Sequence, residues 1–187
     1  KRENGFVYVG RLVPEKQIEK IIEILGKVKR KGWDIHLHIH GGSNNTKYIK
    51  NLRQLCERNR DWVSLEGGIY GKDKLDFMAK HKFGLHGREY EPFGIAVAEL
   101  VKAGCIAWIP NSGGPIEIVN HPDLIYEDVE DAVNKISQVL KSHSMQFSLR
   151  DHLSQQAKKF STERFMSEIK EAVNQFLKTK EASIQTN

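Results

Sequence analysis

Two carboxylates, Glu91 and Glu99, are separated by seven residues whose types suggest a ligand site. The intervening segment begins Pro-Phe-Gly and continues as an apolar run, which predicts a helix over 95–102. Glu91 then precedes the helix and Glu99 lies one turn inside it, so both face the same helix end. The first amides, near Gly94 and Ile95, lack intrahelical partners and carry the positive end of the helix dipole. Such a site suits a ligand with a phosphate and several hydroxyls, because amides donate to phosphate and carboxylates accept from a diol.

Two cations occupy a second stretch near the start of the chain. A short apolar run over 6–9 predicts a buried strand, and Pro14 opens an amphipathic helix that ends near residue 31. Gly10-Arg11 therefore forms a strand-to-helix turn, where open α/β sheets bind phosphates. Arg11 offers a planar fork of donors, and Lys16 adds a point charge one turn into the helix.

Both stretches also have a purely structural interpretation. Glu91 could cap the helix and Glu99 could belong to a structural ion pair, because a buried carboxylate is costly unless it is paired. Arg11 and Lys16 could equally be surface charges. The motif of either stretch alone leaves these alternatives open.

Together, the two stretches resemble the motifs of retaining GT-B glycosyltransferases, the large group 1 family. Residues 91–99 read Glu-Pro-Phe-Gly-Ile-x3-Glu, and residues 10–16 are similar to the family's Gly-Arg-Leu-x-Pro-Glu-Lys-Gly. The last Gly of that motif is Gln17 here, which departs from the family pattern. The resemblance covers about residues 6–177 and implies the C-terminal half of a GT-B enzyme, which grips a nucleotide-sugar donor.

The resemblance also implies a role for each site residue. Arg11 and Lys16 would neutralise the donor diphosphate, Glu91 would contact the transferred sugar, and Glu99 would bind the ribose. The loop 67–70 would hold the base through its backbone, and its Tyr70 could stack on the base or cover the core. The expected catalytic residues are Arg11, Lys16 and Glu91. The expected donor-binding residues are Gly10, Arg11, Lys16, Gly68, Ile69, Glu91, Phe93, Gly94, Ile95 and Glu99. A Gly turn over 111–115 resembles one that lies beside the donor sugar in the family, although a plain turn that starts a helix is the preferred interpretation.

The implied reaction transfers a hexose from a nucleotide-diphosphate donor, with retention, to a glycan, lipid or small-molecule acceptor. No cofactor or metal is expected, since cationic side chains can stabilise the leaving diphosphate and the sequence has no Asp-x-Asp pair. The expected partners are a UDP- or GDP-linked sugar and an N-terminal acceptor domain, which would precede residue 1. Without that domain, this chain is expected to bind nucleotide but not to turn over. Two alternatives remain: a non-catalytic nucleotide-sugar-binding or regulatory domain, and a nucleotide-sugar epimerase of GT-B shape.

Composition is that of a globular domain of 187 residues, with 39% hydrophobic and 28% charged residues and a net charge of +5. The mild positive charge suits phosphorylated ligands and peripheral contact with an anionic membrane surface. Because Lys and Arg are spread along the chain, no nucleic acid is expected as a partner. The sequence shows no signal peptide and no spanning apolar run, and Cys56 and Cys105 are interpreted as reduced core residues. These features favour a cytoplasmic protein at the inner membrane face.

Strand and helix patterns alternate along the chain, which predicts an α/β fold with a Rossmann-like parallel sheet and helices on both faces. Strands are expected over 6–9, 34–40, 62–66, 83–87, 105–110 and 123–126, and helices over 13–31, 47–59, 72–81, 95–102 and 129–140. The segment 141–150 reads as polar and irregular. The domain is expected over 1–180, with closing helices over about 151–180 that Ser161 caps, and a frayed polar tail over 181–187.

Three histidines alternate along the second predicted strand: His36, His38 and His40. They would share one face and span roughly 13 Å, too far for one tetrahedral metal site, so at most two could share an ion. The preferred interpretation is that they pack against a helix layer, with His40 near the edge of the cleft.

Overall fold

The computed structural model describes residues 2–185, and the side chains of residues 2–178. Six parallel strands form one sheet in the order β3-β2-β1-β4-β5-β6. The strands are β1 (Glu3–Val9), β2 (His36–His40), β3 (Val63–Glu66), β4 (His81–Leu85), β5 (Ile106–Pro110) and β6 (Ile125–Tyr126). The predicted Rossmann-like α/β fold is confirmed.

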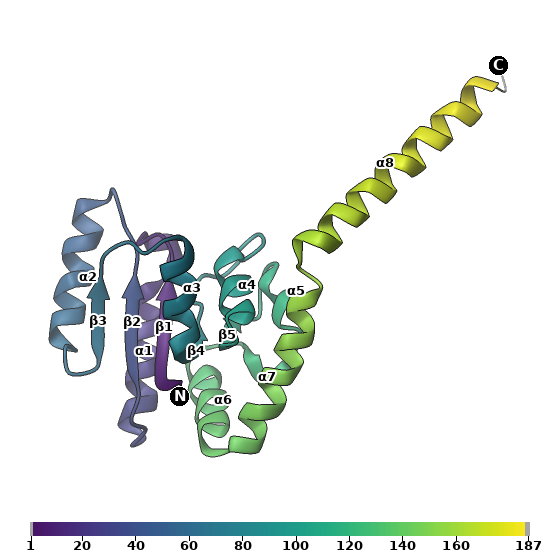
Figure 1. Ribbon diagram of the computed structural model, residues 1–187. Helices are drawn as coiled ribbons and strands as arrows, with labels where there is room; N and C mark the ends of the chain where they lie inside the picture. The colour runs from purple at the N-terminus through teal and green to yellow at the C-terminus, as the bar shows by residue number, and fades with distance from the viewer. Residues whose placement is uncertain (1, 186–187) are drawn as a thin grey trace.

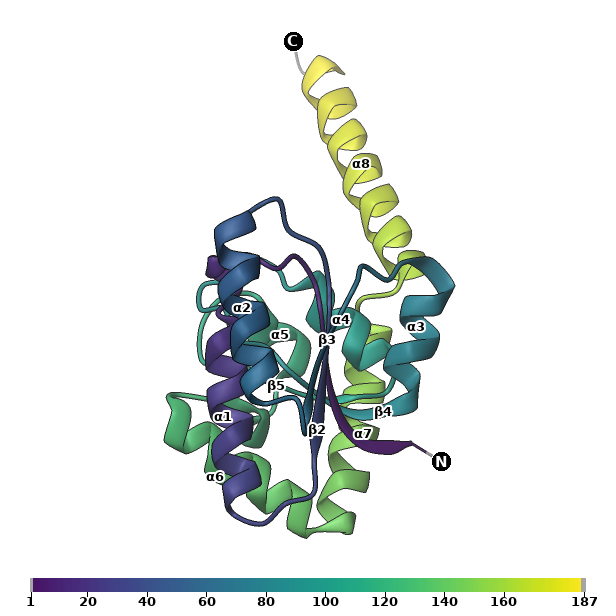
Figure 2. The same ribbon diagram turned by 90° about the vertical axis from the view of Figure 1, so that its left-hand side faces the viewer.

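Helices cover both faces of the sheet, as Figures 1 and 2 show, with α1 and α2 on one side and α3 and α7 on the other. The α-helices are α1 (Ile18–Arg30), α2 (Thr46–Arg58), α3 (Gly71–Lys80), α4 (Ile95–Lys102), α5 (Pro115–Val119), α6 (Val129–Lys141), α7 (His143–Lys158) and α8 (Thr162–Gln185). Between the layers the strands are almost wholly apolar, as expected for a parallel sheet buried on both faces. Its centre holds the tilted rings of Phe6, Phe83 and Trp108, whose centroids lie 5.1–5.9 Å apart. Cys56 and Cys105 are buried and free, as expected.

The helix predicted over 13–31 is divided in the structure. Pro14–Lys16 forms a short 3-10 turn, and α1 begins only at Ile18. Between them Gln17 adopts a left-handed conformation with φ 49°. Glycine adopts this conformation without steric cost, which explains why the family motif has Gly at this position.

The segment 141–150, predicted as irregular, is helical in the structure. Ser142 ends α6 and its hydroxyl accepts a hydrogen bond from the Met145 amide, which caps α7. The inward position one turn later is Gln146, which is buried and donates to the Val139 carbonyl. Because the residue at this buried position is polar, the apolar residues of the segment do not show helical spacing in the sequence.

The last helix, α8, projects away from the sheet layers (Figure 1). Ser161 caps it as predicted, since its hydroxyl accepts from the Arg164 amide. The tail predicted to fray from residue 181 is helical through Gln185, and residues 186–187 lie outside the described part. The apolar side chains at helical spacing along α8 are exposed: Phe165, Ile169, Val173 and Phe176 are 47–67% accessible. Within residues 2–185, no helix combines the length and the apolar character needed to cross a membrane.

Candidate functional site

A cleft of about 1070 Å³ opens at the carboxyl ends of the strands, between the loops that follow β1, β2, β3 and β4. This edge is where open α/β sheets bind their ligands. Every residue predicted for the site lines this one cleft: Gly10, Arg11, Lys16, Gly68, Ile69, Glu91, Phe93, Gly94, Ile95 and Glu99. The fold therefore brings together two motifs that are about eighty residues apart in the chain. The role of each residue stays a prediction.

Backbone contacts fix the turn that carries Arg11. The Gly10 amide donates to the His40 carbonyl at 3.1 Å, and the Tyr8 hydroxyl donates to the Arg11 carbonyl at 2.9 Å. Gly41, at the end of β2, passes so close that a Cβ there would lie 1.9 Å from the Gly10 carbonyl oxygen. Only glycine permits this approach, so the two loops form one rigid wall of the cleft.

Lys16 and Glu91 form the central ion pair, with Lys16 Nζ 2.5 Å from Glu91 Oε2. Their side chains are only 15% and 13% exposed. Burial acts to raise the pKa of Glu91, but the hydrogen bond and charge of Lys16, with Arg88 3.7 Å away, hold that pKa below its ordinary value. The carboxylate is thus ionised at neutral pH, and the cleft keeps a cation and an anion side by side.

Glu99 has its own cation, Lys74 of α3, whose Nζ lies 2.5 Å from Glu99 Oε1. This pairing meets the expectation that a half-buried carboxylate in an apolar helix needs a partner. The sequence gives no sign of Lys74, because the contact depends on how α3 lies against α4. Lys74 also lines the cleft, so it adds a third cation to the predicted pair.

The amino end of α4 points into the cleft with open amides. The cap residue Gly94 has φ 94°, and a Cβ there would meet Pro115 at 2.7 Å, so glycine is required. Helix α4 begins at Ile95, and the first amides of a helix have no intrahelical acceptor. These amides and the helix dipole can hold an anion beside Glu91.

The Gly turn over 111–115 packs against the backbone of the loop that carries Glu91, and it does not line the cleft. The Gly114 amide donates to the Glu91 carbonyl at 2.9 Å. A Cβ at Gly113 would lie 2.3 Å from that same carbonyl oxygen. The turn begins α5, as preferred from the sequence, and it fixes the backbone from which Glu91 projects.

His86, which the sequence analysis leaves without a role, lies at the floor of the cleft directly after β4. Its side chain is 5% exposed, and Nε2 is 3.6 Å from Glu91 Oε2. Burial lowers the pKa of His86 to about 4, so the ring is neutral at physiological pH. The sequence signal that could have identified His86 is its position just after a buried strand, because residues there line the ligand-binding edge of a parallel sheet.

At the rim, the Tyr70 side chain is 78% exposed. It lines the cleft and lies over Gly68, where a Cβ would meet the Tyr70 hydroxyl at 2.7 Å. Phe93 and Ile95 are also exposed at the opening, at 48% and 68%. An apolar rim around a charged floor suits a ligand with a flat ring at one end and anionic groups at the other.

The predicted packing of the β2 histidines against a helix is confirmed for His38 and His40. The Phe77 ring of α3 contacts His38 and His40, with centroids 5.4 and 4.4 Å apart. His40 is 6% exposed, and its Nδ1 lies 3.0 Å from the Gly67 carbonyl in the loop that follows β3.

Comparisons with known proteins agree with this geometry. The model of the family "Glycosyl transferases group 1" matches residues 1–160. A GDP-Man:Man(3)GlcNAc(2)-PP-Dol alpha-1,2-mannosyltransferase of Dictyostelium discoideum is 26% identical over 201 residues, covering 97% of this chain and 40% of that protein. The Homo sapiens protein of the same name is 28% identical over 176 residues, covering 85% of this chain and 36% of that protein. Among solved structures, the pneumococcal O-GlcNAc transferase GtfA in complex with UDP and GlcNAc has a TM-score of 0.81 at 16% identity, covering 95% of this chain and 36% of that one. The chain thus spans well under half of these relatives' lengths, and the structural likeness shows the shared fold.

Proposed function

This chain belongs to the group 1 glycosyl transferases as a C-terminal GT-B domain, and on that premise we propose that it binds the nucleotide-sugar donor of a retaining hexosyltransferase. The observation that carries the proposal is the convergence of Arg11, Lys16 and the amino end of α4 on the two carboxylates. Positive groups and hydrogen-bond acceptors stand within one cleft, as a diphosphate joined to two sugars requires.

The diphosphate would lie between the cations and the helix terminus. Arg11 and Lys16 would hold its oxygens, with the amides of Ile95 and Ala96 donating from the other side. As the glycosidic bond breaks, negative charge grows on the leaving diphosphate, and these fixed donors would stabilise it without reorganising. Side-chain cations would thus stabilise the charge of the leaving diphosphate, and no metal ion is expected to be needed for this in the cleft.

The two carboxylates would orient the sugars. Glu99, one turn inside α4, would accept from the ribose hydroxyls, and Glu91 would accept from the hydroxyls of the transferred hexose. Glu91 already holds Lys16 at 2.5 Å, so the carboxylate would also aim that ammonium group at the diphosphate. Gly68 and Ile69 would contact the base through their backbone, and the exposed Tyr70 ring could stack on it.

We propose GDP-mannose as the donor, because the names of the Dictyostelium and human relatives include GDP-Man. The alignments to these two relatives cover 97% and 85% of this chain. The acceptor would be a lipid-linked glycan at the cytoplasmic face of a membrane, in line with the dolichol-linked acceptors in those names. Transfer itself would need an acceptor-binding portion in addition to this donor-binding domain.

Thermal unfolding with GDP, UDP, ADP and their sugar conjugates tests the proposal. A ligand at about 100 times its dissociation constant should add roughly 2.7 kcal/mol to the free energy of unfolding. We expect GDP-mannose to give the largest shift, and Arg11→Ala and Glu99→Ala to remove it. Arg58→Ala, at an exposed site on α2 outside the cleft, is the matched control and should keep the shift.

Two results would count against the proposal. If no nucleotide shifts the unfolding temperature of the wild type, donor binding by this domain is wrong. If Arg58→Ala removes the shift as fully as Arg11→Ala does, the ligand binds to general positive charge and not to the cleft.

A further inference from the structure

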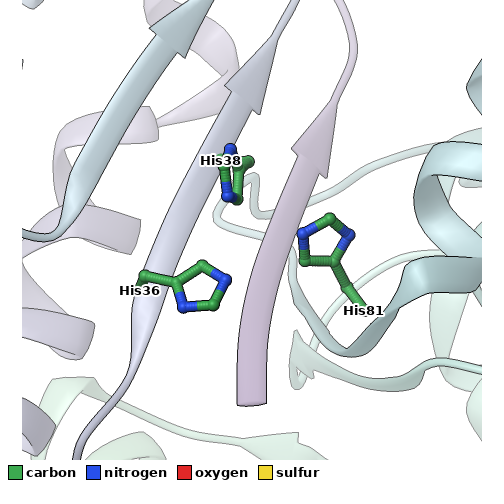
Figure 3. Close-up of side chains that lie close together, drawn as sticks. All are labelled: His36, His38 and His81. Atoms are coloured by element: carbon green, nitrogen blue, oxygen red, sulfur yellow. The ribbon is translucent and has the colours of Figure 1, made fainter. Parts of the chain in front are cut away.

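Three imidazoles converge at the opposite end of the sheet from the cleft. His36 and His38 project from β2, and His81 projects from the start of β4 (Figure 3). One ligand nitrogen from each ring lies within 4.8 Å of the other two. His40, the third alternating histidine of β2, turns toward Gly67, and the third ring of the cluster comes from His81 in a distant segment.

The backbone of β1, which lies between β2 and β4, makes room for the rings. Gly5 is the β1 residue beside them, and a Cβ there would lie 2.3 Å from His36 Nε2 and 2.6 Å from His81 Cδ2. The pairing of β1 with β4 also shifts register: Glu3 pairs with His81 but Phe6 pairs with Phe83. This extra residue in β1 acts as a β-bulge, because it changes which residues of β1 and β4 lie on the same face of the sheet. As a result, His81 lies on the same face as Gly5.

Hydrogen bonds fix which ring nitrogens are free. His81 Nδ1 lies 2.8 Å from the Phe77 carbonyl, and His38 Nδ1 lies 2.6 Å from Glu66 Oε1. Both partners only accept, so each Nδ1 carries the proton and each Nε2 keeps a lone pair. This arrangement, with the outer nitrogen held by a carbonyl or carboxylate, is how proteins orient metal-binding histidines.

The inner nitrogens lack partners within the described part of the chain. His36 Nε2 and His81 Nε2 are buried and make no hydrogen bond there. The carboxylate of Glu3 lies beside both, with Oε2 3.4 Å from His36 Nε2 and 3.9 Å from His81 Nε2. Ring packing alone, with centroids 5.0–5.9 Å apart, would leave these nitrogens unsatisfied.

We propose that His36, His38 and His81 bind a divalent transition-metal ion, with Zn²⁺ the physiological candidate and Glu3 as the fourth ligand. Zn²⁺ takes three imidazoles and a carboxylate in tetrahedral geometry, with bonds of about 2.0–2.1 Å to nitrogen. Neighbouring ligand atoms then lie about 3.4 Å apart, so the rings close by roughly 1 Å through side-chain rotation.

The ion would be structural. It would join β2 to β4 across β1 at the amino ends of the strands, whereas the donor cleft opens at their carboxyl ends. It would satisfy the two orphaned ring nitrogens and fix the start of β4, which leads to His86 and the Glu91 loop. This proposal stands independently of the reaction in the cleft.

The test is metal binding by the 187-residue chain, which is first stripped by dialysis against a chelator and then loaded with Zn²⁺ or Co²⁺ and freed of excess ion. We expect one Zn²⁺ per chain by elemental analysis, and a Co²⁺ complex with the intense visible absorption of tetrahedral coordination. Glu66→Gln, which alters the outer hydrogen bond of His38 and the contact of Glu66 Oε2 with His40 Nε2 at 3.0 Å, should weaken Zn²⁺ binding about 10- to 100-fold. His81→Gln should weaken it further.

His121→Gln is the matched control, because the His121 and His152 rings lie 5.0 Å apart and form a histidine pair outside the proposed site. It should leave binding unchanged. The proposal is wrong if His121→Gln removes the ion while His81→Gln keeps it. A weak octahedral Co²⁺ spectrum of the wild type would also overturn it, and that result needs no variant to fold.

Discussion

The buried imidazole of His86 makes the free energy of unfolding depend on pH in a predictable direction. Its side chain is 5% exposed, and burial lowers its pKa to about 4. In the unfolded chain the ring titrates near its ordinary pKa of about 6.5. Between these values the unfolded chain binds more protons than the folded one, so lower pH favours unfolding. The stabilising contribution is fully present above about pH 6.5 and is lost as the pH falls toward about 4.

The size of this effect follows from the two pKa values. They differ by about 2.5, and each pKa unit corresponds to about 1.36 kcal/mol, so the full loss is about 3.4 kcal/mol. Linkage gives about 2.5 kcal/mol of this loss between about pH 7.5 and about pH 4.5. That is a sizeable part of the stability of a typical domain, so the effect is measurable.

Urea unfolding at those two pH values, on the wild type and on His86→Gln, measures the contribution of this one ring. The variant removes the titrating group, so we expect its unfolding free energy to fall by about 2.5 kcal/mol less than that of the wild type. His143→Gln, at an exposed site on α7, should follow the wild type. Equal losses in wild type and His86→Gln would refute the assignment of a neutral, buried ring to this position.

Three further predictions concern the walls of the cleft. Gln17→Gly should stabilise the protein by up to about 1 kcal/mol in urea unfolding, because it relieves the left-handed conformation at φ 49°; a loss of stability would contradict that strain. Gly41→Ala should destabilise the protein by about 3 kcal/mol, since its Cβ would lie 1.9 Å from a backbone oxygen. Gly42→Ala, with nothing within 4 Å, should change the unfolding free energy by less than about 0.5 kcal/mol, and equal effects at the two glycines would be the wrong result. A double-mutant cycle of Lys16→Met and Glu91→Gln should give a coupling of about 1–3 kcal/mol, because the pair is mostly buried at 2.5 Å; a coupling near zero would mean that the pair does not form in solution.

The fold and the predicted cleft residues could be foreseen because local patterns carry them. Apolar runs give the strands, and the break at Pro92-Phe93-Gly94 before an apolar run gives the start of α4 within a residue. The rule that parallel strands present their carboxyl ends at one edge then brings Arg11 and Glu91 together. None of these inferences needs the three-dimensional packing of side chains.

What the sequence left out depends on such packing. Lys74 reaches Glu99 only because α3 lies beside α4, and His81 joins the β2 histidines only through a register shift in β1. The start of α7 was missed because Gln146, a polar residue, occupies a buried position by donating to the Val139 carbonyl at the end of α6. In each case a tertiary contact determines where a polar side chain lies, and local patterns do not contain that contact.

The most direct measurement is a crystal structure of the chain with GDP. The proposed function predicts the β-phosphate within hydrogen-bonding distance of Arg11, Lys16 and the first amides of α4, with the ribose hydroxyls on Glu99. Lys16 should then bridge Glu91 and the phosphate. A nucleotide bound elsewhere, or one whose diphosphate lies away from the amino end of α4, would contradict the proposed donor site.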